Sequence, residues 1–562
     1  MIGELPPALI FIIGAVLLPL FAGRWQVVWA LAVPVFGLLN LLYLPDGDNF
    51  SVQLLDFTLE FGRVDQLSFL FGLLFHIAAI IGVIFAMHVR DMTQHVSTLL
   101  YAAGALGAVF AGDLIALFIS WEVMAVASVF LIWARRTERA TRAGMRYLII
   151  QIGSGVILLA GAIVYFHETG SIEFSYLGTD SLGGKLIFFA FGIKCAWPFL
   201  HTWLTDAYPE ATPTGTVFLS AFTTKVAVYA LARGYPGTEA LIYIGTAMAM
   251  FPIFFAVIEN DLRRVLAYSM INQIGFMVVG IGLGTALALN GAVSHAFNDV
   301  IFKGLLFMSM GAVLHMTGRI NGSELGGLYK SMPITTTLCI VGAASISAFP
   351  LFSGFVSKSM VMAAAAQEGY IVVFLLLLFA SAGVFHHAGI KIPFFTFFAH
   401  DSGIRTTEPP INMLIAMGAA AAICIFNGTY PWLLYSLLPW EVAYEPYTLT
   451  HVLTQTQLLF FSALAFALLM ISGVYPPELK LINLDADWFY RRVAKRAALA
   501  LGRWIDTIYT GALGWARAQI VAVIAEVYRH HGPRGLLART WPIGSTVSWI
   551  VVLLGLYFVL HI

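Results

Sequence analysis

Residues 184–233 read GKLIFFAFGIKCAWPFLHTWLTDAYPEATPTGTVFLSAFTTKVAVYALAR, and this stretch decides how the rest of the chain is interpreted. It comprises two apolar segments of membrane-spanning length joined by a short polar hinge. Each segment carries one lysine, Lys194 in the first and Lys225 in the second. Pro198 follows Lys194 by four residues, so we expect the first helix to be broken beside its charge, because proline frees a backbone carbonyl and bends a helix.

The cost of placing a lysine in a membrane favours a functional role for this stretch. An ammonium group in hydrocarbon costs at least ~2.5–3.5 kcal/mol on insertion scales, and a broken helix is tolerated in a bilayer only where it faces protein or water. A lysine near a helix end could extend its side chain to the membrane surface. Lys194, however, lies near the middle of its segment and beside the break. We therefore interpret it as part of a site inside the membrane.

The composition is that of a polytopic membrane protein. Of the 562 residues, 60% are hydrophobic and 11% are charged, whereas soluble domains average about 25% charged residues. The formal net charge is zero, which argues against nucleic acid as a partner. The three cysteines lie apart without metal-ligand spacing, and the sequence contains no phosphate-binding or dinucleotide-binding glycine motif. We expect no metal and no cofactor in this chain.

Apolar segments of about 20 residues recur along the chain, and we count about sixteen of them. Residues 334–366 are too many for one straight span and contain the motif FPLFSGF, so we expect a second broken helix there. The sequence thus predicts an all-α polytopic membrane protein with about 14–16 transmembrane helices. We expect these to include two inverted five-helix repeats, each containing a broken helix.

Lysine and arginine in the loops predict the orientation of the chain. Basic loops alternate with loops that are acidic or nearly free of basic residues, in step with the predicted spans. The basic loops are 134–144, 259–264, 317–333 and 476–542. The other set comprises 45–65, 167–183 and 436–454. We expect the basic loops in the cytoplasm and both termini outside.

The pattern of spans divides the chain into six segments. They are N-terminal transmembrane helices (1–96), a first repeat (97–232), a second repeat (240–398), additional spans (411–475), an amphipathic region (477–541) and a last span (543–561). The amphipathic region holds ten of the thirty basic residues with tryptophans interspersed, which is typical of a helix on the membrane surface or against a partner subunit. About 45 helical residues would extend ~70 Å. A solvated loop is the alternative.

Lysine and arginine are distributed differently. Five of the nine lysines fall within predicted spans, whereas the arginines gather in loops and at span ends. Arginine keeps its proton in proteins, but a desolvated lysine can approach neutrality. A path for protons needs groups that lose and regain a proton, so the intramembrane lysines indicate such a path. They are Lys194, Lys225, Lys303, Lys358 and Lys391.

The spacing of these lysines suggests an internal repeat. Lys194 and Lys358 are 164 positions apart (358 − 194), and Lys225 and Lys391 are 166 apart (391 − 225). Each pair begins in an interrupted helix, at Trp197–Pro198 and at Phe349–Pro350. Paired broken helices in corresponding halves of a chain are typical of a transport site near the membrane midplane. Coincidence is the alternative explanation of the spacing.

Acidic and histidine residues accompany the lysines. Glu122 lies in the apolar segment FISWEVMAVASVF, and we expect a nearby lysine as its partner because carboxylates in a membrane are paired. His295, Asp299 and Lys303 have i, i+4, i+8 spacing and so share one helix face, either as a static hydrogen-bonded ladder or as a proton relay. We expect one of His386 and His387, which precede Lys391, to face the same path.

At these residues the sequence resembles the antiporter-like subunits shared by respiratory complex I and Mrp-type multisubunit Na⁺/H⁺ antiporters. The shared motifs cover about residues 97–398: WEVM, GIK…PFLHTWLTDAYPEATPTG…TKVAVYALAR, NDLRRVLAYSMINQIGF, SHAFNDVIFKGLLFM and FPLFSGFVSK. The words YPEATPTGT and HHAGIKIPFF resemble the Mrp D subunit more than the complex I subunits.

The resemblance implies roles for the residues that match. In the family the glutamate at Glu122 modulates the lysine at Lys194, and protons move laterally along a water-filled polar axis, here through Lys225, His295 and Lys303 toward Lys358. Two positions depart from the family pattern: Thr205 replaces a usual proline in WLTDA, and Asp299 stands where a second histidine is common. The implied partners are other membrane subunits, H⁺ and Na⁺, in a bacterial inner membrane.

The leading hypothesis is a proton-translocating subunit of a multisubunit Na⁺/H⁺ antiporter, and three alternatives stand beside it. The first is the proton-pumping module of a complex I-like or hydrogenase complex, driven by redox partners. The second is the membrane subunit of an inorganic-carbon uptake system. The third is a scaffold whose polar residues only hold helices together. In each case we expect no redox site in this chain.

Overall fold

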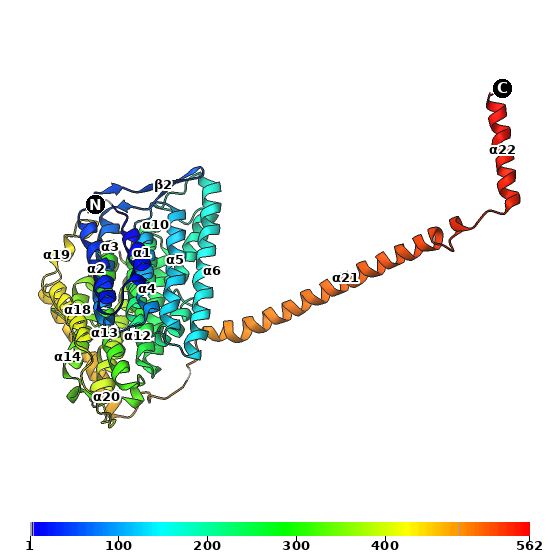
Figure 1. Ribbon diagram of the computed structural model, residues 1–562. Helices are drawn as coiled ribbons and strands as arrows, with labels where there is room; N and C mark the ends of the chain where they lie inside the picture. Colours follow the sequence, from blue (N-terminus) through cyan, green and yellow to red (C-terminus); the bar gives the residue numbers. More distant parts are fainter. Residues whose placement is uncertain (1–2, 4, 482, 562) are drawn as a thin grey trace. The chain divides into compact units, whose positions relative to one another are not determined.

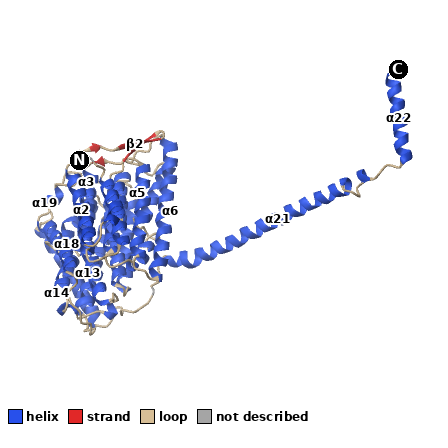
Figure 2. Ribbon diagram, in the orientation of Figure 1, coloured by secondary structure: helices blue, strands red, loops and turns tan. Residues whose placement is uncertain are grey.

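The computed structural model describes residues 3, 5–481 and 483–561. The chain separates into two units, residues 1–483 and 484–562. Nearly all regular structure is helical, and the short strands lie near the N-terminus (Figures 1 and 2). Within the described residues, thirteen helices are long and apolar enough to cross a membrane, and two shorter apolar helices accompany them. The prediction of an all-α polytopic membrane protein is confirmed.

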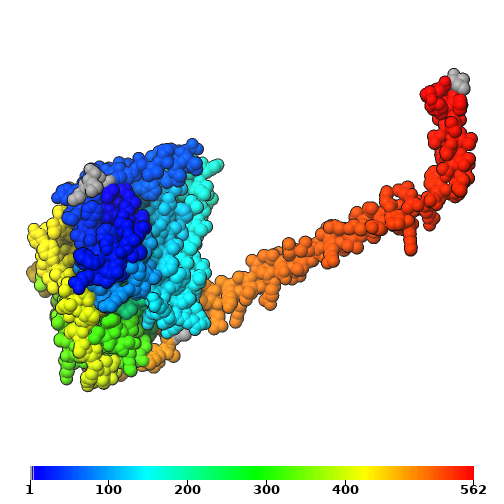
Figure 3. Space-filling model, viewed as in Figure 1, coloured from blue at the N-terminus to red at the C-terminus, as the bar shows by residue number. Residues whose placement is uncertain are grey.

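The N-terminal part of the first unit comprises three helices and a small β segment. The helices are α1 (Pro7–Leu17), α2 (Arg24–Leu42) and α3 (Gln66–Ala86). In the space-filling view much of this part of the chain, in blue, lies on the surface of the unit (Figure 3), whereas α3 is mostly buried. The strands pair antiparallel as β1 (Gly47–Asp48) with β4 (Arg63–Val64), and β2 (Ser51–Leu54) with β3 (Phe57–Glu60).

Two successive groups of helices follow and make up most of the first unit. The first group is α4 (Met92–Val109), α5 (Leu114–Trp133), α6 (Glu138–Thr169), α7 (Leu182–Lys194), α8 (Thr202–Ala207), α9 (Gly215–Ala221) and α10 (Thr223–Gly234). The second is α11 (Ala240–Ile258), α12 (Leu262–Leu283), α13 (Ala286–Thr317), α14 (Pro333–Ile346), α15 (Ser353–Gln367) and α16 (Ile371–Val384). Helix α16 continues through π-helical η5 (Phe385–Ile390), α17 (Lys391–Pro393) and π-helical η6 (Phe394–Phe398).

The two groups are copies of one arrangement. The N-cap residues of α5 and α12, Asp113 and Asp261, are 148 positions apart (261 − 113), and both accept hydrogen bonds from the first turn of their helix. Helices α6 and α13 both have 32 residues and end at a left-handed glycine, Gly170 and Gly318, again 148 apart. Glycine is favoured at this cap because it has no Cβ to strain the left-handed backbone.

The two broken helices match at the level of single residues. The break between α7 and α8 contains left-handed Ala196 (φ 61°) and Phe199 (φ 68°), and the break between α14 and α15 contains Ala348 (φ 58°) and Leu351 (φ 74°). Corresponding residues are 152 positions apart (348 − 196), and a proline lies between the members of each pair, at Pro198 and Pro350. Both broken helices expected from the sequence are confirmed.

The repeat register differs from the one that the lysine spacing suggested. A register of 148–152 makes Ile346, not Lys358, the counterpart of Lys194 (346 − 194 = 152). The spacings of 164 and 166 between lysines therefore do not mark equivalent positions, and that inference is wrong. Helix caps and helix breaks define the repeat register because local backbone geometry sets their positions. A lysine is a weaker marker, because a residue on either side of a break can place its charge there.

Three further helices complete the first unit: α18 (Ile411–Thr429), α19 (Trp432–Tyr435) and α20 (Leu449–Ile471). Helix α12 is buried over its whole apolar window and α13 over most of it, whereas α6, α11, α16 and α20 expose more than they bury or as much. The interior of the first unit is thus built around α12 and α13, together with the fully buried α9 and α10. Polar residues on these two helices cannot reach the surrounding membrane and must find partners inside the protein.

The second unit contains one long helix and one short helix. The π-helical turn η7 (Phe489–Ala494) leads into α21 (Lys495–His531), followed by α22 (Ile543–His561). The continuous stretch from residue 489 to residue 531 would be ~65 Å long at 1.5 Å per residue. This matches the length expected for the amphipathic region. Its apolar content is also compatible with crossing a membrane, so its placement on the membrane surface stays a prediction.

Candidate proton path

The central row of the candidate path lies on α13. His295, Asp299 and Lys303 are each fully buried, and their spacing of four residues places them on one face of the helix. Their partners come from different helices of both repeats. The row expected from the sequence therefore lies inside the protein, and it touches several helices rather than forming a ladder along α13 alone.

An ion pair joins the two repeats at the middle of this row. Lys225 Nζ on α10 lies 2.7 Å from Asp299 Oδ2, and both side chains are fully buried. Lys225 also donates to the carbonyl of Ser220 at 3.2 Å. That carbonyl is accessible because the helical path is interrupted at Phe222, between α9 and α10. A buried charge is stable only with such a partner, so each of these two residues accounts for the presence of the other.

His295 connects the row to two other helices. Its Nδ1 lies 3.0 Å from Ser357 Oγ on α15, and its Nε2 lies 3.2 Å from Gln273 Oε1 on α12. Because an amide oxygen only accepts, Nε2 carries the proton and Nδ1 accepts from the serine hydroxyl. Gln273 Nε2 donates to Asn272 Oδ1 at 2.6 Å, which fixes the amide in this orientation. The ring is thus held in one tautomer.

Lys303 is the last residue of the row on α13, and it contacts the neighbouring helix α12. Its Nζ donates to Ser269 Oγ on α12 at 2.9 Å. The π-helical turn η5 places His387 in the buried interior. Of the two histidines, His387 is therefore the one that faces the interior. His386 is half-buried and packs its ring against Phe466 and Tyr475, at centroid distances of 5.1 and 5.6 Å.

At the first helix break, Lys194 binds the backbone of α5. Its Nζ donates to the Trp121 carbonyl at 2.7 Å and lies 4.3 Å from the centroid of the Trp121 ring. Glu122 is the next residue, and its Oε1 is buried without a hydrogen bond. Among the described residues, no ion pair within 4.0 Å joins Lys194 to Glu122. The expected pair is therefore not formed in this structure, because the ammonium turns to the carbonyl one residue earlier.

The Glu122 carboxylate fits against a glycine of α6. A Cβ added to Gly155 would lie 1.5 Å from Glu122 Oε1. The absence of a side chain at Gly155 thus provides the space that the carboxylate occupies. This neighbour could not be identified from the sequence, since Gly155 is 33 positions away (155 − 122) on another helix.

At the second helix break, Lys358 binds the end of α14. Its Nζ donates to the carbonyl of Ile346 at 2.9 Å and lies 5.1 Å from the Phe276 ring centroid. Ile346 is the last residue of α14, and the final carbonyls of a helix have no partner within the helix. A cation there also interacts favourably with the helix dipole. Lys358 therefore supplies both a donor and a charge at the break.

Lys391 is set apart from the central row. Its Nζ lies 2.7 Å from the Val257 carbonyl and 2.6 Å from the Glu259 carbonyl, at the end of α11. It also forms an ion pair of 2.8 Å with Glu478, in the segment after α20. This lysine clamps a helix end and a neighbouring segment.

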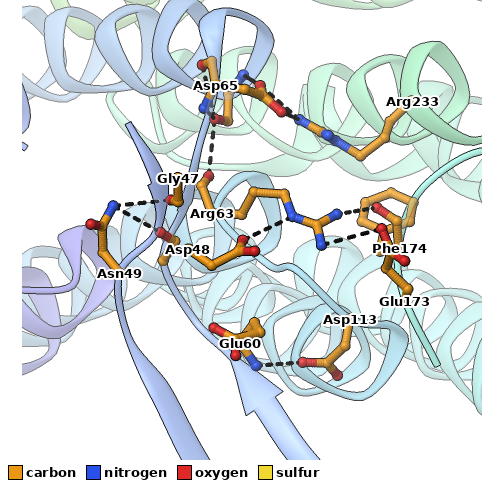
Figure 4. Close-up of polar contacts among 12 residues, drawn as sticks. Gly47, Asp48, Asn49, Glu60, Arg63, Asp65, Asp113, Glu173, Phe174 and Arg233 are labelled. Atoms are coloured by element: carbon orange, nitrogen blue, oxygen red, sulfur yellow. Dashed lines mark hydrogen bonds and ion pairs between the residues drawn. The ribbon is translucent and has the colours of Figure 1, made fainter. Parts of the chain in front are cut away.

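A second polar network closes the end of the unit near the β segment. Arg63 binds Asp48 Oδ1 (3.1 Å) and the Phe174 carbonyl (2.9 Å), and the Glu60 amide donates to Asp113 (2.7 Å) (Figure 4). Arg233, two turns beyond Lys225 on α10, donates to both oxygens of Asp65. Burial raises the pKa of Asp65, but Arg233 and hydrogen bonds from Ser68 outweigh it and hold the pKa below its usual value.

Three polar residues of the site were not predicted from the sequence. They are Ser269, Gln273 and Ser357, which bind Lys303 and His295. The available signal was polarity within spans that are otherwise apolar: Ser269 and Gln273 lie in AYSMINQIGF, and Ser357 immediately precedes Lys358. Uncharged polar residues are common in membrane helices, so this signal does not by itself separate a site from ordinary helix packing.

The fold and the site define the class of the protein: a multi-span membrane protein with a row of buried ionisable groups across two repeats. Residues 111–384 match the family described as NADH:quinone oxidoreductase/Mrp antiporter, TM. This part of the chain, 274 of its 562 residues, is similar to that family. The family resemblance inferred from the sequence is confirmed.

The similar proteins come from several complexes. The Na⁺/H⁺ antiporter D subunit of Alkalihalophilus pseudofirmus is 31% identical over 312 residues, covering 51% of this chain and 63% of that protein. Hydrogenase-4 component B of Escherichia coli is 28% identical, covering 54% of this chain and 52% of that protein. The matched region thus spans roughly half to two thirds of these relatives.

Two solved structures share the fold. A chain of the Mrp complex from Dietzia sp. DQ12-45-1b has a TM-score of 0.70 at 21% identity, covering 83% of this chain and 98% of that chain. A chain of the archaeal membrane-bound sulfane sulfur reductase has a TM-score of 0.72 at 22% identity, covering 99% of this chain and all of that chain. At these identities the likeness concerns the fold.

Proposed function

We propose that the protein is a proton-translocating subunit of a multisubunit Na⁺/H⁺ antiporter, in a bacterial inner membrane with its basic loops in the cytoplasm. Other membrane subunits of that complex are its partners. The observation that carries this proposal is the buried Lys225–Asp299 pair, which joins the two repeats at 2.7 Å. The antiporter subunits among the relatives support the proposal.

The proposed proton path runs through buried ionisable side chains in a definite order. Lys194 at the first break and Glu122 beside it form the first station, with Lys225 and Asp299 next. His295 and Lys303 flank Asp299 on α13, and Lys358 at the second break is the last station. His387 is buried in the same interior, while His386 and Lys391 lie apart from the row on α13. Each repeat, residues 97–232 and residues 240–398, thus places one lysine of the path at its helix break.

Charge competition drives each transfer in this mechanism. The free Oε1 of Glu122 competes with the Trp121 carbonyl for the Lys194 ammonium. Movement of Lys194 toward Glu122 alters the field at Lys225, which is held to Asp299 by charge. When Lys225 passes its proton to His295 and on to Lys303, Asp299 is left to stabilise the charge that Lys303 gains, one turn along α13. A proton gained by one repeat thus favours proton movement in the next.

Transport measurements in membrane vesicles test the proposal. Lys194→Ala and Glu122→Ala should abolish cation-dependent proton flux while the complex still assembles. Lys185→Ala is a matched control, because Lys185 is on the same helix α7 but is exposed, and it should retain the flux. Normal flux with the Lys194→Ala protein would refute the assignment. Loss of assembly in all lysine variants would instead favour the scaffold alternative.

A redox-driven proton pump is the second candidate. Relatives named as a component of hydrogenase-4 and as a subunit of F(420)H(2) dehydrogenase favour it. The path within this chain would be the same, with a different driving partner. Purification of the tagged protein from native membranes followed by mass spectrometry separates the two: small membrane subunits indicate an antiporter, whereas iron–sulfur or flavin subunits indicate a redox complex.

A further inference from the structure

A cavity of about 430 Å³ adjoins the terminal lysine of the path. It lies between α15, α16 and the beginning of α20, and its lining includes Lys358 and the loop that precedes α20. The polar members of its lining include Lys358, Ser359, Thr448, His451, Thr454 and Gln455. This volume is enough for several water molecules, since one water occupies ~30 Å³ in the liquid. Lys358 is thus next to a space large enough for water.

His451 on α20 is held in this cavity by two contacts. Its ring stacks on Phe355, with centroids 4.2 Å apart and planes 14° apart. Its Nδ1 lies 2.7 Å from the Pro446 carbonyl. Because a carbonyl only accepts, Nδ1 carries the proton and Nε2 keeps a free electron pair. Phe355 is three residues before Lys358 on α15, so the stacked imidazole is fixed beside the helix that carries the lysine.

Gln455, one turn further along α20, binds the second helix break itself. Its Nε2 donates to the Ser347 carbonyl at 3.3 Å, and the adjacent carbonyl, that of Ile346, accepts from Lys358. Beyond Gln457 the large exposed side chains of α20 are apolar, including Phe460, Phe461 and Leu464. The polar residues of α20 are therefore concentrated where the helix meets the end of the proton path.

We propose that this cavity is the outlet of the proton path and that His451 exchanges protons between Lys358 and water on the face that carries loop 436–454. The inference rests on the proposed function. The Lys358 ammonium gives its proton to cavity water or to Nε2 of His451. The resulting imidazolium releases that proton to water outside, and neutral Lys358 is reloaded from the α13 row. His451 keeps Nδ1–H bound to Pro446 throughout.

Removal of the imidazole tests the role of His451. Proton flux of the His451→Ala complex should fall about tenfold, less than the ~10²-fold or more typical of a general acid–base group, because cavity water partly substitutes. Imidazole added on the outlet side should restore flux. His167→Ala is the control, since His167 is exposed in the last turn of α6, and should show neither effect. Unchanged flux in the His451→Ala complex would overturn the inference.

Labelling of a cavity residue tests the side on which the path opens. Thr454→Cys should react with a membrane-impermeant cationic thiol reagent from the side of loop 436–454, and the label should lower flux. The three native cysteines are buried, so the unmodified protein is the blank. Phe461→Cys, on the apolar part of α20, is the matched control and should not react. Reaction of Thr454→Cys only from the side of the basic loops would overturn the inference.

The two proposals fail in different ways. If Lys194→Ala abolishes flux while His451→Ala is neutral and Thr454→Cys is unreactive, the path stands and only the outlet is wrong. If Lys194→Ala keeps full flux, the proposed function itself fails, whatever the result at His451.

Discussion

The two helix breaks share one backbone but place their lysines on opposite sides of it. In both, a left-handed alanine and a second left-handed residue enclose a proline: Ala196, Pro198 and Phe199 in the first, with counterparts 152 positions later. Lys194 is the last residue of the helix before its break, whereas Lys358 lies on the helix after its break. The two breaks thus have the same backbone conformation, but the lysine precedes the first break and follows the second.

The partners of the two lysines differ accordingly. Lys194 donates to a carbonyl of another helix, that of Trp121 on α5. Lys358 donates to Ile346, the counterpart of Lys194, across its own break. The first charge therefore depends on a neighbouring helix that also carries Glu122, and the second on its own helix end. We interpret Lys194 as the switchable station, whose hydrogen-bond partner can change during transport. Lys358 is the fixed station, which keeps its partner.

The largest expected effect comes from cutting the contact between the repeats. Asp299→Asn leaves Lys225 buried without a counter-charge, which should lower the free energy of unfolding by about 3–5 kcal/mol and abolish flux. Thermal unfolding of the purified protein measures the first effect. Asp401→Asn is the control, because the Asp401–Arg405 pair is exposed and exposed ion pairs contribute little to stability. Equal effects would show that the buried pair does not join the repeats energetically.

Substitution at one pair of equivalent positions tests the backbone of the two breaks without changing a charge. A Cβ on Gly354 would lie 1.9 Å from the Ser345 carbonyl oxygen, whereas its counterpart in the first break, Thr202, already has a side chain (354 − 152). Gly354→Ala should cost about 3 kcal/mol of stability, since backbone cannot yield easily. Thr202→Ala should cost about 1 kcal/mol. Similar melting temperatures for the two variants would contradict this asymmetry.

Replacing Lys358 should lower the stability of the protein more than replacing Lys194, whereas both replacements should have the same effect on transport. Lys358→Met leaves the terminal Ile346 carbonyl buried without a donor, at a cost of about 1–3 kcal/mol. Lys194→Met should cost less, because the Trp121 carbonyl lies inside α5, where an intrahelical donor serves it. Both variants should lose proton flux. If Lys194→Met proved the less stable, the assignment of fixed and switchable stations would have to be reversed.

The smallest expected effect isolates Glu122. Gly155→Ala puts a methyl group where Glu122 Oε1 lies, and a flexible carboxylate can move away, so stability should change by less than about 1 kcal/mol. Proton flux should slow because the carboxylate no longer competes for Lys194. Gly153→Ala on the same helix meets no atom within 4 Å and should leave flux unchanged. Flux assays of the two variants side by side measure the difference.

Local features of the sequence determined much of this protein. The break beside Lys194 follows from Pro198, and the break at Phe349–Pro350 from the same chemistry. The shared face of His295, Asp299 and Lys303 follows from helical spacing. Each of these properties depends on residues within about two helical turns of one another, so it can be predicted without knowing how the helices pack. The length and apolarity of the spans belong to the same group.

Only the tertiary structure decided which partners these residues have. Lys225 binds Asp299, 74 positions away (299 − 225), Lys194 binds the backbone beside Glu122, and Lys391 binds Glu478 instead of joining the central row. The cavity that joins Lys358 to His451 likewise arises where α20 packs against α15 and α16, which lie much earlier in the sequence. Proton paths are made of such contacts, because a proton moves between groups that are neighbours in space, and helix packing alone brings those groups together.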